Sequence, residues 1–150
     1  EKCDFCIADQ FFVFLDQLLG SERVALRVIA VEVATAAIKQ TAVLANKGKL
    51  GGRSVLDGRL LASFVERCRD MVPSVRSRAF TGLAAALPGL ASYPEGLELL
   101  RASANKKTGK AKGCLDLTSL FCAAAADEKA PVRRAALGLF ETSLRAFHSS

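Results

Sequence analysis

Two cysteines near the start of the chain have the spacing of a metal-binding pair. Cys3 and Cys6 are separated by two residues, as in many zinc sites. A structural zinc site needs four ligands, however, and the sequence offers no second pair of this kind and only one histidine, His148, at the far end. We therefore expect free thiols in a reducing compartment, with no metal and no other cofactor.

The shortage of histidine also argues against catalysis. A nucleophilic Ser or Cys needs a neighbouring base, and the acidic residues stand singly at expected helix caps and turns. The glycine-containing stretch 48–54 lacks the Gly-x4-Gly-Lys-Ser/Thr spacing of a phosphate loop and follows an expected helix, not a strand. We expect neither an enzyme nor a protein that binds a small-molecule substrate.

Positive charge is concentrated in two stretches of the chain. The net charge is +6, and residues 46–54 and 105–113 together contain seven Lys and Arg residues and no acid. Such side chains displace counterions from phosphates without reading the base sequence. No aromatic residues are interleaved with them, which argues against stacking on single-stranded bases. The two stretches are candidates for non-specific contact with duplex DNA; the alternative is a pair of solvated loops.

A turn motif occurs twice in clear form, at residues 70–79 and 127–136. Counting from its Asp, a Val stands at +5, an Arg at +6 and an Ala at +9. A degenerate copy at 21–30 has Ser in place of Asp and Leu in place of Val. The copies begin 49 and 57 residues apart. This exceeds a helical repeat of about 40–47 residues, and the two basic stretches account for the excess.

Apolar spacing predicts one helix before and one helix after each copy of the turn motif. Pro88 is expected to end the fourth helix. Ile29 and Val33 lie off the main apolar stripe of the second helix, which we therefore expect to be buried on several sides, and Phe140 and Leu144 are expected to face inward on the last helix. The predicted helices span about 9–19, 22–45, 55–69, 73–87, 117–126 and 131–147.

The turn motif resembles that of HEAT repeats, and helix pairs used repeatedly are typical of an α-solenoid. We expect an all-α protein, an α-solenoid of about three HEAT-like helix pairs. In stacked HEAT repeats an Arg at +6 commonly reaches an Asp of an adjacent turn, so we expect such a ladder from Asp70, Arg76, Asp127 and Arg133. The predicted repeats are 9–45, 54–88 and 116–148, with basic linkers at 46–54 and 105–113.

The whole of residues 1–150 is interpreted as one HEAT-repeat segment of a longer solenoid. The chain begins without Met and directly in apolar sequence, and it has no signal-peptide pattern. Its longest uncharged stretch, 79–94, is interrupted by prolines and glycine, so we expect no membrane span.

A more specific resemblance rests on residues 65–79, 95–100 and 127–137. In combination these stretches resemble the D-three HEAT-repeat subunit of the condensin II complex, and Asp127-Glu128-Lys129 is the most telling part. The resemblance implies a non-catalytic scaffold in mitotic chromosome condensation, located in the nucleus on chromosomes. It also implies three partners: a kleisin subunit, SMC ATPase heads, and double-stranded DNA or chromatin. The alternative is a generic HEAT adaptor that binds a peptide or kleisin-type partner without touching DNA.

The set of candidate DNA contacts also includes arginines near the expected turns. These are the arginines that the predicted ladder does not use. These surplus arginines would form a basic ridge along one edge of a solenoid, close to the second basic stretch. The full set of candidate DNA-binding residues is Lys47, Lys49, Arg53, Arg67, Arg69, Arg78, Lys106, Lys107, Lys110, Lys112 and Arg134.

Overall fold

The computed structural model describes residues 2–47, 58–92 and 117–148. Within these ranges the chain forms six α-helices and one short 3-10 helix, and no strand. The all-α prediction is confirmed. None of the described helices is both long and apolar enough to cross a membrane. The elements are α1 (Lys2–Leu19), α2 (Val24–Asn46), α3 (Gly58–Glu66), η1 (Arg67–Arg69), α4 (Pro73–Ala91), α6 (Leu117–Ala125) and α7 (Ala130–His148).

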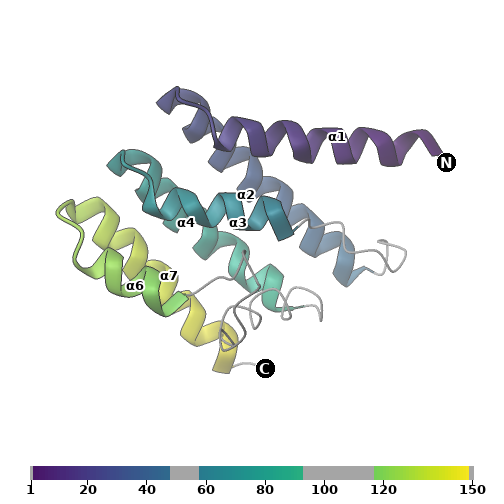
Figure 1. Cartoon of the computed structure of the whole chain (residues 1–150). Helices are drawn as coiled ribbons and strands as arrows, with labels where there is room; N and C mark the ends of the chain where they lie inside the picture. The colour runs from purple at the N-terminus through teal and green to yellow at the C-terminus, as the bar shows by residue number, and fades with distance from the viewer. Residues whose placement is uncertain (1, 48–57, 93–116, 149–150) are drawn as a thin grey trace, which may run out of the picture.

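The helices form three pairs that lie side by side, α1 with α2, α3 with α4, and α6 with α7 (Figure 1). The second helices of the pairs make the most extensive contacts, because α4 packs against α2 on one side and α7 on the other. On the other layer, α1 contacts α3. The pairs therefore follow one another in space in the same order as in the sequence, with α4 at the centre.

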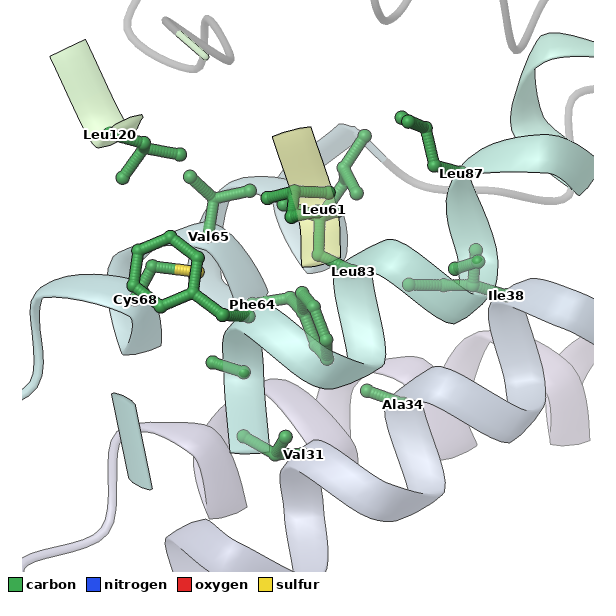
Figure 2. Packing of buried hydrophobic residues seen from close by; sticks show 14 of the residues in the cluster. Val31, Ala34, Ile38, Leu61, Phe64, Val65, Cys68, Leu83, Leu87 and Leu120 are labelled. Atoms are coloured by element: carbon green, nitrogen blue, oxygen red, sulfur yellow. The ribbon is translucent and has the colours of Figure 1, made fainter. Parts of the chain in front are cut away.

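The core is shared between neighbouring pairs. Phe64 of α3 and Phe80 of α4 are fully buried, as are Ile38 of α2 and Leu120 of α6. Figure 2 shows the labelled side chains of α2, α3, α4 and α6 converging on this core. No single pair could bury these side chains alone, so the contacts between pairs stabilise the fold.

Two glycines allow α2 and α4 to approach closely. A Cβ added to Gly82 would stand 2.2 Å from Thr35 Oγ1 and 3.0 Å from Phe64 Cζ, and one added to Gly89 would stand 2.8 Å from the Cβ of Ala42. These distances are shorter than ordinary van der Waals contact. Glycine is therefore required sterically at both places, and Gly82 is the tighter.

Pro88 does not end the fourth helix as predicted. The helix continues through it to Ala91, and the N–H of Ser92 donates to the carbonyl of Gly89. A proline inside a helix costs about 3 kcal/mol. Continuation of the helix places Leu90 in the core at full burial, and burial of a leucine side chain contributes about 1.5–3 kcal/mol in the opposite direction.

Apolar side chains on the outer faces of the first and last pairs are more exposed to solvent than predicted. Ile29 and Val33 of α2 are exposed, and so are Phe140 and Leu144 of α7. The expectation that they would be buried is wrong. α2 and α7 lie at the two ends of their layer, so that no further helix within the described ranges covers their outer faces.

Candidate functional site

The three copies of the turn motif adopt the same local structure. In each, the first side chain accepts a hydrogen bond from the backbone N–H two residues later. Asp70 accepts from Val72 and Asp127 from Lys129, both at 2.9 Å, and Ser21 accepts from Arg23 at 3.2 Å. Short polar side chains favour such turns because they replace a missing backbone partner. The local sequence therefore fixes where each carboxylate lies.

The arginine at +6 folds back onto its own turn. Nη1 of Arg27 donates to the carbonyl of Ser21 at 2.8 Å, and Nη1 of Arg76 donates to the carbonyl of Asp70 at 2.8 Å. Arg133 does the same with the carbonyl of Asp127 at 2.6 Å. One edge of each guanidinium is thus held by its own turn, which leaves the edge formed by Nε and Nη2 for another partner.

That second edge binds the aspartate of the next turn. Nε and Nη2 of Arg27 donate to the two carboxylate oxygens of Asp70, at 2.8 and 3.0 Å. Arg76 does the same with Asp127, at 2.7 and 3.1 Å. Bidentate pairs of this kind combine charge with a fixed geometry. We call these two pairs the rungs of an arginine–aspartate ladder.

The rung to Asp70 is the more deeply buried. The side chain of Asp70 is 3% exposed and that of Arg27 is 11% exposed. Burial by itself raises the pKa of Asp70. Hydrogen bonds from Arg27 and Val72, and the charges of Arg27 and Arg67, outweigh it and leave this pKa below its usual value. Asp70 is therefore a fixed anion at neutral pH.

The rung to Asp127 has the same character. The hydrogen bonds from Arg76 lower the pKa of Asp127, burial opposes them, and the Lys129 N–H and the charges of Arg76 and Arg133 lower it further. A carboxylate with a lowered pKa, whose two oxygens both accept hydrogen bonds from Arg76, is a weak base near neutral pH. The ladder joins helix pairs; it is not arranged for proton transfer.

The lowered pKa of Asp127 predicts a loss of stability in acid. A carboxylate of this kind stabilises the fold fully above its unfolded-state pKa, close to 3.8, and the contribution disappears as pH falls through the folded-state pKa. We expect Asp127→Asn to be less stable than the unaltered chain at pH 6, and the difference to narrow below pH 3.8. Urea midpoints measured from pH 6 to about pH 2 test this. Glu128→Gln, at the exposed neighbouring carboxylate, is the control and should show no such narrowing.

The predicted ladder is confirmed for Arg76 and Asp127. The structure adds the rung between Arg27 and Asp70, which the sequence could have indicated, because Arg27 occupies the +6 place of the degenerate motif copy. Arg133, the fourth member of the predicted ladder, binds its own turn but no aspartate of another turn within the described residues.

Three of the candidate DNA-binding arginines make ion pairs with acidic residues. Arg67 Nη1 lies 3.2 Å from Asp70 Oδ2, and Arg69 Nη1 lies 3.7 Å from Glu66 Oε1. Arg78 pairs with Glu32, which joins α4 to α2. Arg67 therefore belongs to the buried rung, whereas Arg69 and Arg78 make surface pairs of small energetic value.

The remaining candidates are divided between exposed positions and positions outside the described residues. Lys47 and Arg134 are exposed, and neither has an ion pair within the described ranges. They lie in different parts of the chain, at the end of α2 and in the first turns of α7. The candidates outside the described residues are Lys49, Arg53, Lys106, Lys107, Lys110 and Lys112.

The described residues contain no cluster of three or more His, Cys, Asp or Glu side chains that could hold a metal ion. The side chains of Cys3 and Cys6 lie outside the described part of the chain. Cys68 is buried in the core, and burial raises the pKa of its thiol to about 12. Since the thiolate is the reactive form, Cys68 is an inert core residue.

A scan of protein-family models and searches of curated proteins and of solved structures found no match to this chain.

Proposed function

We propose that this chain is a non-catalytic scaffold, built as a short α-solenoid of HEAT-like helix pairs. The observation that carries the proposal is the ladder. At two successive junctions the arginine at +6 of one turn is held by its own turn and binds the aspartate of the next turn. A repeated junction of this kind serves to stack units in register, and stacked units present extended surfaces for other macromolecules.

The specific scaffold that we propose is a segment of a D-three-type component of condensin II. The support is the sequence resemblance at residues 65–79, 95–100 and 127–137. The ladder is compatible with it, because two of the three turns that form the rungs, those at Asp70 and Asp127, lie in these stretches. On this proposal the partners are a kleisin subunit, SMC ATPase heads and duplex DNA on nuclear chromosomes.

The DNA contact is proposed to rest on the lysines of residues 105–113 more than on the turn arginines. Arg67, Arg69 and Arg78 already have acidic partners, which a phosphate would have to displace. The four lysines of 105–113 have no acid in their own stretch. Phosphate contacts of this kind weaken with salt. The logarithm of the binding constant falls against the logarithm of the salt concentration with a slope of about 0.9 per neutralised phosphate.

A salt titration of duplex binding tests this proposal. We expect measurable affinity at low salt, and a salt slope that falls by about 2 when Lys106 and Lys107 are both replaced by alanine. The matched control is the double replacement Lys39→Ala and Lys129→Ala, which removes the same charge elsewhere and should leave the slope unchanged. No binding at low salt, or equal effects of the two double replacements, would remove the DNA contact from the proposal.

The second candidate function is an adaptor for a kleisin-type segment without DNA contact. The pairing of the turn arginines with acids favours it, because a basic ridge is largely neutralised by these pairs. Calorimetry with helical kleisin segments distinguishes the two. Binding of a segment by a chain that shows no affinity for duplex DNA supports the adaptor, and failure of every segment contradicts it.

A further inference from the structure

We draw no further inference here: the strongest candidate, the exposed apolar face of α7 made by Leu137, Phe140 and Leu144, carries none because nothing in the structure shows what covers it.

Discussion

Replacement of Asp70 by alanine is expected to destabilise the fold by about 3 kcal/mol, since loss of one partner of a buried ion pair leaves the other charge uncompensated. Asp70 accepts from Arg27, from Arg67 and from the N–H of Val72. The substitution therefore removes the rung and the turn hydrogen bond together. Urea unfolding at pH 7, followed by far-UV circular dichroism, measures the change.

The control for Asp70 is another carboxylate with an arginine partner. Glu66 lies 3.7 Å from Arg69, and its side chain is 60% exposed. We expect Glu66→Ala to cost less than about 0.5 kcal/mol, as for ordinary surface pairs. Equal costs at Asp70 and Glu66 would contradict the view that the rung holds the first junction together.

Replacement of Gly82 by alanine is the second change with a large expected effect. The added Cβ would meet Thr35 Oγ1 at 2.2 Å and the ring of Phe64 at 3.0 Å, so α2 and α4 must move apart or repack. We expect a loss of about 1–3 kcal/mol, the usual range for an overfilled core. Thermal or urea unfolding of the variant gives the value.

Gly138 provides the matched control, because a Cβ there meets nothing within 4 Å although the residue also lies inside a helix. Gly138→Ala should stabilise the protein by about 0.5–1 kcal/mol through helix propensity alone. Thr35→Ala, which removes the Oγ1 that Gly82→Ala would strike, should recover part of the loss when the two are combined. A stabilising Gly82→Ala would show that the two helices are not held at this separation.

Much of the fold could be predicted because the local signals agree with one another. The turn motif and the apolar spacing around it both indicate helices joined by tight turns, and α3, α4, α6 and α7 lie where these signals predict helices. The rung from Arg76 to Asp127 was predictable for the same reason, since the residue types repeat at fixed places. Arg27 could have been included on the same grounds.

The remaining errors concern relations between elements. Periodicity shows that Phe140 and Leu144 form an apolar stripe, but it does not show whether another helix covers that stripe. The continuation of α4 through Pro88 depends on the burial of Leu90 by other helices. The ion pair of Arg78 with Glu32 joins residues 46 positions apart, and neither short stretch gives any sign of the other. The sequence predictions of free surface arginines were therefore less secure than those of helices.

The ladder has a consequence for the order in which the chain folds and unfolds. The hydrogen bonds within each turn join residues two and six places apart, whereas the rungs join residues 43 and 51 apart. Closing a long loop has a larger entropic cost than closing a short one. Each turn can therefore form early and prepare its arginine before a neighbouring pair arrives. The rungs then add to the core contacts that couple adjacent pairs, and the strength of the combined coupling decides whether unfolding shows one transition or several.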